Sequence, residues 1–325
     1  NFFNSDFDER FWRILIGPWI SIASETFYNR YNSLSLTRKL KKPNKLIFQN
    51  IGDNNFFELK NTNDFFSIIN DSNWNENIFY EISKDLKISN QINKKKIANK
   101  REKKNFSIKK IISKFIFLPV FLGKKLIVNT YMSRIDEYKL QIKLKHFPVK
   151  NLPDYFEDIK LPYKYDDNLR NKLITKNINK KDPNIYNCIK RLIFKSLPII
   201  YLENFNYLKN YMSRNHFTNK LRLIVSAQNF DGNEYFKFIV AFSKLKNSKV
   251  FYLQHGNTDG VTRFDHYNNH MITPDKYLTW GWDKSDFKKN DIHQKLNIKK
   301  FCNIKISSYK KFSKKFEFEN KIILY

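Results

Sequence analysis

The second half of the chain alternates short apolar runs with longer segments of helical spacing, and this alternation restricts the fold more than any other feature. Residues 221–225 and Lys249–Leu253 are typical of buried strands, and residues 233–245 between them have the apolar spacing of a helix. Residues 277–280 and 301–306 supply two further strands. Because parallel neighbours need a crossover that is usually helical, this order predicts a parallel sheet. The sequence therefore predicts an α/β, Rossmann-like domain in which the first two strands are parallel neighbours.

Before residue 202 the pattern is less regular and predicts helical additions on the N-terminal side of the sheet. Apolar residues at helical spacing predict a helix over residues 6–33, which Pro18 should kink or divide. Residues 154–182 show little clear periodicity. The other expected elements are strands at 45–49, 125–131 and 198–202 and helices at 62–69, 74–86 and Asn184–Ser196.

The formal net charge of +29 by itself indicates an anionic partner. Only 11 of the 60 basic residues are Arg, however, and Arg is preferred for bidentate recognition of phosphates and bases. The excess of Lys accompanies many Asn, Ile and Phe residues, which indicates an AT-rich coding sequence. We therefore expect no specific nucleic-acid partner. Residues 90–105 are a Lys-rich run typical of a solvated linker or loop, so deleting them should leave the fold intact.

Residues 106–122 combine apolar positions at helical spacing with Lys109, Lys110 and Lys114, which predicts a basic amphipathic helix. Such a helix either lies on an anionic membrane surface or packs its apolar face on the core, and both alternatives stay open. No uninterrupted apolar run approaches the roughly 20 residues that span a bilayer. Cys188 and Cys302 are the only cysteines and stand far apart, as expected in a reducing cytosol. The expected location is cytoplasmic, with residues 106–122 as the candidate peripheral contact on the inner membrane face.

The segment that follows Lys249–Leu253 is the most informative for chemistry. Gln254, His255 and Gly256 leave a strand end, which is where open α/β sheets bind ligands. His255 could act as a general base because its ordinary pKa lies near neutrality, or could merely satisfy backbone groups of the loop. Gly256 and Gly260 could present backbone N–H groups to an anion. Ser226, Gln228 and Asp231 follow the neighbouring strand and either face the same cleft or make turns.

A metal site is a weaker hypothesis. His266 and His270 form an H-x-x-x-H pair, which His255, Asp265 or Cys302 could complete, but this spacing is common by chance and we predict no metal. Dinucleotide-binding G-x-G-x-x-G, P-loop and G-x-S-x-G patterns do not occur, which excludes a simple dehydrogenase, a P-loop ATPase and an α/β-hydrolase.

Four motifs occur in order along nearly the whole chain. They are R-F-W-R-I-L-I-G-P-W at residues 10–19, L-P-I-I-Y-L-E-N-F at 197–205, Q-H-G at 254–256 and D-K-Y-L-T-W-G-W at 275–282. They resemble the successive motifs of the transferase family found in O-antigen and other surface-polysaccharide gene clusters. This chain departs from the family pattern at Asn257, where a second glycine is usual.

The resemblance implies a GT-B-like glycosyltransferase with two Rossmann-like domains, distantly similar to capsule sugar transferases. Residues 1–312 would be the N-terminal, acceptor-side domain. Residues 313–325 would be a linker and the first strand of a C-terminal domain that binds the nucleotide sugar, so the chain is interpreted as an internal fragment, inactive alone. The reaction would move a sugar from a nucleotide-activated donor to a saccharide or lipid-linked acceptor, with no cofactor held by this fragment.

The same resemblance implies the roles of the site residues. His255 is the expected base or orienter at the reacting hydroxyl, with Asp259 or Asp265 as the alternative base. Arg263 and the amides of Gly256 and Gly260 would stabilise the leaving phosphate. The residues expected to bind substrate are Gln254, Gly256, Gly260, Arg263, Ser226 and Gln228.

The alternative from another class is a non-catalytic basic protein that binds polyanions such as nucleic acid or an anionic membrane surface. The two hypotheses differ in where the tryptophans lie. Trp12, Trp19, Trp280 and Trp282 are buried or line a cleft in a transferase, and are exposed beside Lys in a polyanion-binding protein.

Overall fold

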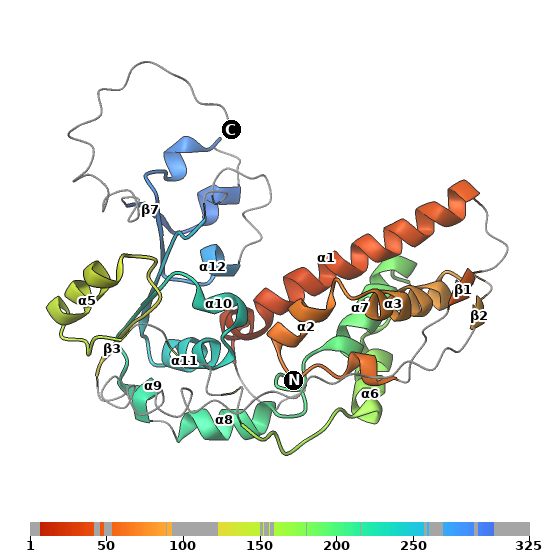
Figure 1. Cartoon of the computed structure of the whole chain (residues 1–325), viewed down its shortest axis with the longest axis horizontal. Helices are drawn as coiled ribbons and strands as arrows, with labels where there is room; N and C mark the ends of the chain where they lie inside the picture. The colour runs from red at the N-terminus through yellow and green to blue at the C-terminus, as the bar shows by residue number, and fades with distance from the viewer. Residues whose placement is uncertain are drawn as a thin grey trace. The chain divides into compact units, whose positions relative to one another are not determined.

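The structure is a computed structural model that describes residues 7–41, 46–48, 54–88, 90–92, 123–149, 152, 156, 159–179, 181–214, 216–256, 259, 269–288 and 292–301. The chain divides into two compact units. Figure 1 labels the helices and strands that belong to them. Unit 1 comprises Asn1–Ile111, Asp154–Thr218 and Phe230–Phe242, and unit 2 comprises Ile112–Pro153, Asn219–Asn229 and Ser243–Tyr325. The extent of the expected Rossmann-like domain, 1–312, and of the linker after it stays a prediction.

Unit 1 is mainly helical. A short parallel pair of strands, β1 (Leu46–Phe48) and β2 (Asn90–Ile92), also belongs to it. Its helices are α1 (Glu9–Lys41), α2 (Thr62–Ile68), α3 (Ser72–Asp85), α6 (Asp167–Asn177), α7 (Asn184–Ser196), α8 (Phe205–Ser213), the 3-10 turn η1 (Asn54–Phe57) and most of α11 (Glu234–Lys244). The short helices α9 (His216–Lys220) and α10 (Asn229–Gly232) each have residues in both units, because the limits of the units along the sequence fall within them.

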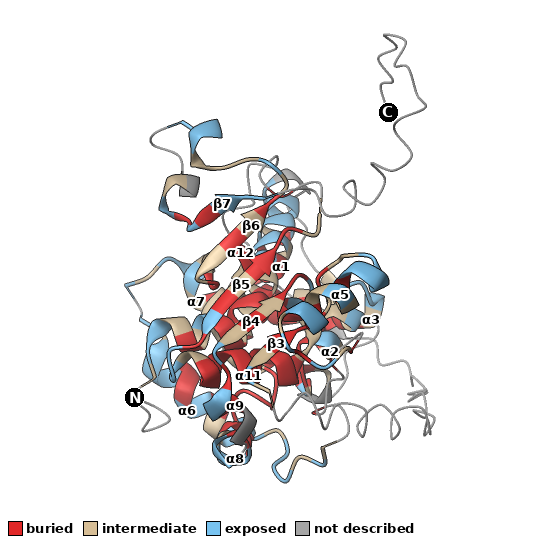
Figure 2. Cartoon of the chain, turned by 90° about the vertical axis from the view of Figure 1, so that its left-hand side faces the viewer, coloured by how far each residue is buried: buried red, intermediate tan, exposed pale blue. Residues whose placement is uncertain are grey.

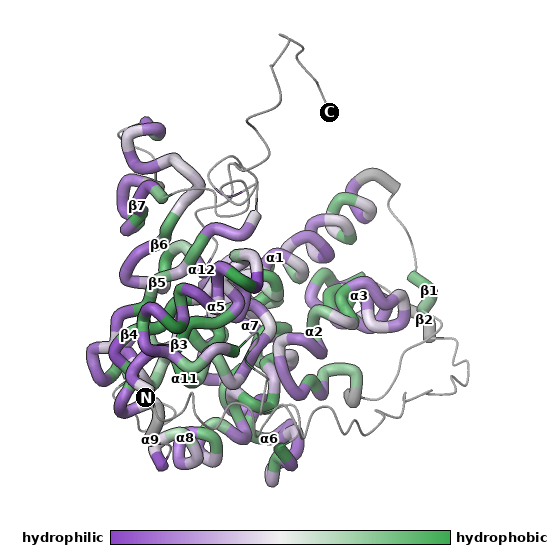
Figure 3. The backbone as a smooth tube through the Cα atoms, turned by 60° about the vertical axis from the view of Figure 1, so that its left-hand side comes forward, coloured by the Kyte–Doolittle hydropathy of each residue, from purple (hydrophilic) through white to green (hydrophobic). Residues whose placement is uncertain are grey.

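Helix α1 owes its length to one continuous apolar face. Phe11, Leu15, Trp19 and Phe27 recur at multiples of four residues and are all fully buried. Green and purple segments alternate along α1 in Figure 3, as expected for a helix with one buried face. The Asp8 carboxylate accepts a hydrogen bond of 2.8 Å from the Phe11 backbone N–H and so starts the helix. α1 contacts both α3 and α7, so these helices of unit 1 pack around it.

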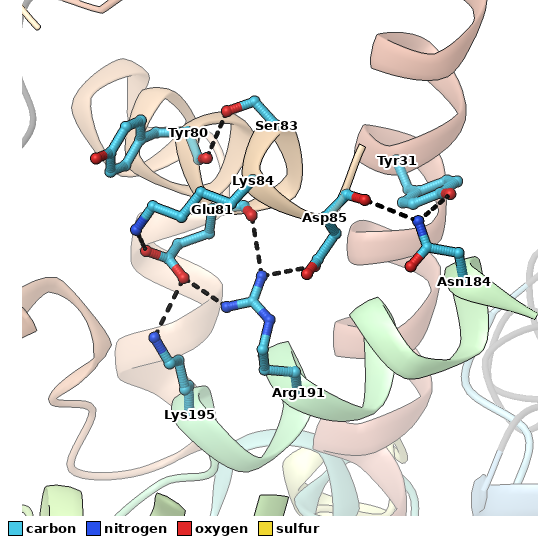
Figure 4. Close-up of polar contacts among 9 residues, drawn as sticks. All are labelled: Tyr31, Tyr80, Glu81, Ser83, Lys84, Asp85, Asn184, Arg191 and Lys195. Atoms are coloured by element: carbon cyan, nitrogen blue, oxygen red, sulfur yellow. Dashed lines mark hydrogen bonds and ion pairs between the residues drawn. The ribbon is translucent and has the colours of Figure 1, made fainter. Parts of the chain in front are cut away.

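Ion pairs join α3 to α7 within unit 1 (Figure 4). The Glu81 carboxylate of α3 is almost fully buried and accepts hydrogen bonds from Arg191 and Lys195 of α7. Arg191 also donates to Asp85 at 2.7 Å, and Lys84 donates to Glu81 at 2.6 Å. Every acidic group of the cluster is therefore paired, and the cluster fixes the two helices side by side.

Unit 2 contains the predicted parallel sheet. In the described part of the chain, five strands form it in the order in which they occur: β3 (Lys125–Ile127), β4 (Leu223–Ser226), β5 (Lys249–Leu253), β6 (Lys276–Thr279) and β7 (Ile298–Lys300). All neighbouring pairs are parallel, with Leu223 opposite Lys249 and Phe251 opposite Lys276. Buried and half-buried residues alternate along β4 and β6 (Figure 2). The predictions of an α/β fold and of β4 and β5 as parallel neighbours are confirmed.

The first strand of the sheet is supported by helix α5 (Arg134–Lys143), also in unit 2. The Gln141 side chain donates to the carbonyl oxygen of Ile127 at 2.7 Å and to that of Val149 at 2.8 Å. His146 accepts a hydrogen bond of 3.3 Å at its Nε2 from the Ile127 backbone N–H. These contacts satisfy backbone groups of β3 that a neighbouring strand would otherwise bind. Among the described residues of unit 2, three further short helical segments occur: α12 (Asn269–Ile272), η4 (Lys284–Asp286) and η5 (Ile292–Lys295).

Several predicted elements differ in the structure. Pro18 does not divide α1, because burial of the apolar face on both sides of Pro18 outweighs the lost hydrogen bond. Residues 198–202 form turns instead of a strand: the backbone N–H groups of Ile199 and Ile200 donate to Leu59 and Lys60. An apolar run of five residues fits a buried turn as well as a strand, which is why the pattern misleads.

Other differences concern the bounds of elements. α6 lies within the stretch that shows little periodicity. β3 ends four residues early, since Asn129 and Tyr131 adopt positive φ angles of 51° and 67° that end an extended strand. Asn90–Ile92 pairs as β2, so the start of the expected linker at 90–105 belongs to a sheet. β7 ends at Lys300, directly before the expected strand at 301–306, of which the structure describes only Phe301, outside any strand.

The expected helix at 106–122, the rest of the run up to residue 105 and residues 302–325 lie outside the described residues. Among the residues that the structure describes, none of the helices combines the length and the apolar character needed to cross a membrane.

Candidate active site

The candidate site lies where the strands of unit 2 end. β5 ends at Leu253, and Gln254, His255 and Gly256 follow it directly. Because β3 to β7 are parallel, the loops that follow them leave the sheet at one edge. Open α/β sheets bind ligands at this edge. The fold thus places His255 where a ligand would be expected.

His255 is half-buried and lies against two other rings. Its ring centroid is 5.9 Å from that of Tyr131 and 5.4 Å from that of His270. His270 is buried, and its Nε2 lies 3.7 Å from Oδ2 of the buried Asp259. The Tyr277 hydroxyl donates a short hydrogen bond to the same carboxylate oxygen. His255, Asp259 and His270 therefore form one cluster, and the hydrogen bond from Tyr277 holds the Asp259 carboxylate in place.

The charge of Asp259 follows from these neighbours. Burial raises the pKa of the Asp259 carboxyl, but the interactions with His270 and Tyr277 and the nearby His255 outweigh burial. The pKa of Asp259 therefore lies below its usual range, and the group is ionised at neutral pH. The ionised Asp259 carboxylate thus lies beside His270 and within 4.8 Å of a ligating nitrogen of His255, so the cluster carries a negative charge next to both imidazoles.

The same three side chains offer metal-ligating atoms that lie within 4.8 Å of one another in the described part of the chain. Zinc binds such atoms at about 2.0–2.2 Å, so tetrahedral ligands are about 3.4 Å apart. The 3.7 Å between His270 and Asp259 is close to this separation, and the third atom, from His255, lies within 4.8 Å of both. The expectation of a metal-free site stays a prediction.

Gln254 connects the loop after β5 to the loop after β6. Its side-chain Nε2 donates to the carbonyl oxygens of Gly256, at 2.8 Å, and Asp259, at 3.2 Å. Its Oε1 accepts from the backbone N–H of Trp280, at 2.7 Å, and from the indole N–H of Trp282, at 2.9 Å. The whole hydrogen-bonding capacity of this buried amide is used within the protein. In this structure Gln254 positions the loop that carries His255 and Asp259.

The other predicted site residues are distributed unevenly. Ser226 is fully buried at the end of β4, and Gln228 is exposed and donates to the Tyr131 hydroxyl at 3.0 Å. Gly256 is half-buried beside His255. The predicted residues Gly260, Arg263 and Asp265 lie outside the described residues, as do His266 and Cys302 of the metal hypothesis. The structure therefore brings together His255 and Asp259 of the three expected catalytic residues.

Sequence patterns identify some members of this site and miss others. His270 enters the sequence analysis only as half of an H-x-x-x-H pair, while the structure places it against Asp259. Tyr277 belongs to the D-K-Y-L-T-W-G-W motif, so closer attention to that motif could have found it. Tyr131 belongs to none of the four motifs, and only the three-dimensional structure brings it to His255.

The parallel sheet and the polar cluster at its carboxyl edge define the class: an α/β protein with a candidate ligand site beyond the strand ends. Within that class the chain belongs to the LIC12162 family of transferases, because the family model described as LIC12162 family transferase matches residues 1–325. No curated protein and no solved structure shows significant similarity to the chain. The expectation of a transferase family is confirmed.

Proposed function

We propose that this transferase is a GT-B-like glycosyltransferase of surface-polysaccharide biosynthesis, of the O-antigen or capsule type. The observation that carries the proposal is the position of His255. It stands at the carboxyl end of β5, half-buried, with an ionised carboxylate and a second imidazole behind it. An imidazole at a strand end with a carboxylate beside it supports a role as a general base that takes a proton from a hydroxyl group.

In the proposed reaction, His255 accepts the proton of the acceptor hydroxyl. At the same time the oxygen of that hydroxyl forms a bond to the anomeric carbon of the donor sugar. The bond between that carbon and the phosphate oxygen breaks, and the nucleotide leaves with the electron pair. The Asp259 carboxylate, which lies within 4.8 Å of a ligating nitrogen of His255, stabilises the His255 imidazolium that forms. The Gly256 and Gly260 amides and Arg263 remain the candidates for stabilising the leaving phosphate.

The proposal includes the partners expected from the sequence. The donor is a nucleotide sugar, bound mainly by a C-terminal domain that would begin at residues 313–325. The acceptor is a saccharide or a lipid-linked saccharide. The reaction takes place at the cytoplasmic face of the membrane, with residues 106–122 as the candidate peripheral contact.

The positions of the tryptophans favour this proposal over a polyanion-binding protein. Trp19 is fully buried, and Trp12, Trp280 and Trp282 are half-buried. Trp12 packs against Phe205 with ring centroids 4.9 Å apart, and Trp282 donates to Gln254. None of these four described residues presents an exposed ring beside Lys, as stacking on a nucleic acid would require.

The test is sugar transfer by the full-length protein, with radiolabelled nucleotide sugars supplied one at a time and a lipid-linked saccharide extract as acceptor. The wild type should transfer label from at least one donor. His255→Ala should reduce the transfer rate by about 10²-fold or more, the usual scale for general-base catalysis, with an unchanged melting temperature. Near-wild-type transfer by the folded variant would remove His255 from the mechanism.

His146→Ala is the matched control within unit 2. His146 is buried and accepts a backbone hydrogen bond from β3, so its loss should lower the melting temperature while the folded fraction keeps its activity. Absence of transfer from every nucleotide sugar by a folded, full-length wild type would contradict the proposed function itself.

A further inference from the structure

A small pocket opens in unit 2 at the carboxyl ends of β3 and β4, next to the candidate active site. Its volume is about 170 Å³. Pockets for drug-sized ligands span about 300–1,000 Å³, so this pocket is too small for a complete nucleotide sugar and suits a single ring. The side chains that give it its chemistry are Asn129, Tyr131, Arg134, Glu137, Tyr138 and Gln228.

The wall of the pocket is a turn held in an unusual conformation. Asn129 and Tyr131 have positive φ angles of 51° and 67°, and a bulky residue such as Tyr adopts this conformation rarely. The turn keeps this conformation because hydrogen bonds hold it to helix α5 on one side and to the loop after β4 on the other. Between the two residues, Thr130 donates from its backbone N–H and its hydroxyl to the buried Glu137 carboxylate, at 3.0 and 2.5 Å. Strained residues held in this way cluster at ligand sites.

Contacts with the loop after β4 complete the wall. Asn129 donates from its side chain to Asn229 at 2.9 Å, and the Ala227 backbone N–H donates to the Asn129 carbonyl oxygen at 2.9 Å. Gln228 donates to the Tyr131 hydroxyl at 3.0 Å. The Tyr131 side chain is therefore held at its hydroxyl by Gln228, and it packs on Ala227 and Leu253. The pocket is pre-formed, so a ligand does not have to order it.

The lining chemistry favours a hydroxyl-rich ring over a phosphate. Two tyrosines offer apolar faces and polar tips, and the amides of Asn129 and Gln228 add donors and acceptors. The single described cation of the lining, Arg134, is accompanied by the Glu137 carboxylate, so the pocket is close to neutral. A diphosphate would require an excess of positive charge or several free backbone N–H groups. A sugar ring needs planar polar groups at its hydroxyls and an aromatic face.

We propose that this Tyr131 pocket binds one pyranose ring of the acceptor saccharide. The Tyr131 ring forms part of the pocket wall and lies 5.9 Å, between centroids, from the ring of His255. His255 does not itself line the pocket, so a saccharide with one ring seated against Tyr131 is held next to the imidazole rather than on it. The inference rests on the proposed function for its catalytic meaning, while binding of the ring itself is independent of any donor.

The test is saturation-transfer NMR on the folded protein with three neutral probes: methyl α-D-glucopyranoside, methyl β-D-galactopyranoside and methyl α-D-mannopyranoside. We expect saturation transfer to at least one probe. Tyr131→Asn should reduce the signal about fivefold or more, because the variant removes the ring while Asn tolerates the positive φ. Gln228→Ala, on an exposed position, should weaken the same signal without a change in melting temperature.

Tyr186→Ala is the control, since Tyr186 is an exposed tyrosine of unit 1 that is 57% accessible. The saturation-transfer signal of the Tyr186→Ala variant should match that of the wild type. Saturation transfer to none of the probes, or equal signals from the wild type and the folded Tyr131→Asn variant, would overturn the pocket assignment. Tyr131-dependent binding without transfer from any nucleotide sugar would instead refute the proposed function and leave the pocket standing.

Discussion

His146 and His255 belong to the same unit and have opposite environments. His255 is half-buried at the end of a strand, with the Asp259 carboxylate within 4.8 Å of its ligating nitrogen. His146 is 5% exposed and uses its Nε2 to accept the Ile127 backbone N–H. The pKa of His146 is lowered to about 4: burial is the largest cause, a backbone hydrogen bond at Phe147 opposes it, and the nearby Lys125 adds to the lowering. At this scale a histidine's burial and partners, and not its residue type, decide its role.

The buried His146 should make the stability of the protein depend on pH. Its pKa is near 6.5 when unfolded and about 4 when folded, so below pH 6.5 the unfolded chain binds a proton that the native state does not. The free energy of unfolding should therefore fall between pH 6.5 and pH 4, by up to about 1.4 kcal/mol per pH unit. Urea unfolding at pH 7, 6 and 5 measures this slope.

His146→Asn provides the comparison, because Asn keeps an acceptor but does not titrate. The variant should be less stable at pH 7 and should lack this part of the slope. Identical slopes for the variant and the wild type would show that His146 is not the titrating group.

At the scale of elements, two of the motifs found in the sequence serve to pack the protein. Tyr201, in the L-P-I-I-Y-L-E-N-F motif, accepts a hydrogen bond of 2.6 Å from the fully buried Lys237 and donates to Glu234. Glu203 of the same motif forms a buried ion pair with Arg170, at 2.7 Å. Asp275 of the D-K-Y-L-T-W-G-W motif accepts from Lys244 and from the β5 backbone at Val250. Both motifs thus contain residues that stabilise the fold.

The ion pairs between α3 and α7 predict a specific response to acid (Figure 4). Burial raises the pKa of Glu81, but Lys84, Lys195 and Arg191 outweigh burial and lower it to about 2. The stabilisation is complete above the ordinary pKa of 4.5 and is lost as the pH falls from 4.5 towards 2. Glu81→Gln should lower the free energy of unfolding at pH 7 by about 1.5–3 kcal/mol, the range for hydrogen bonds to charged groups.

Thermal unfolding between pH 7 and pH 3 tests this prediction. The wild type should lose its advantage over Glu81→Gln as the pH drops below 4.5. Glu25→Gln, at an exposed position of α1, is the control and should behave as the wild type throughout. A Glu81→Gln variant as stable as the wild type at pH 7 would mean that the cluster does not stabilise the packing of α3 on α7.

At the scale of the whole molecule, the net charge of +29 is the dominant property. Part of the charge is engaged in ion pairs, as at Lys237, Lys244, Arg170 and Arg191. Lys provides most of the remainder, and it interacts with phosphates as a point charge without the bidentate geometry of Arg. Long-range attraction to polyanions is therefore expected, and specific recognition is not.

We expect weak, salt-dependent binding to non-specific duplex DNA. The dissociation constant should lie at about 10⁻⁴–10⁻⁶ M at physiological salt, the range of purely electrostatic binding, and should rise steeply between 50 and 200 mM salt. Fluorescence anisotropy with a labelled duplex measures both quantities. Nanomolar binding that persists at 200 mM salt would favour the polyanion-binding alternative over the transferase.

Local patterns predict much of this fold. The apolar runs of β4 and β5 and the helical spacing of α7 and α11 lie close to their predicted bounds, because each depends on the periodicity of its own residues. The turn at residues 198–202 and helix α6 could not be predicted in this way. Their conformations depend on distant partners: Ile199 and Ile200 bond to Leu59 and Lys60, and Arg170 of α6 bonds to Glu203.

The sequence by itself determined the parallel α/β sheet and the place of His255 at a strand end, since both follow from the order of strands and helices along the chain. Only the tertiary structure decided what surrounds that histidine. Asp259 and His270 meet in one cluster, Gln254 joins two loops, and Tyr131 arrives from the far side of β4. These contacts depend on strand order, on register and on two positive φ angles in a turn, and local periodicity carries no information about any of them.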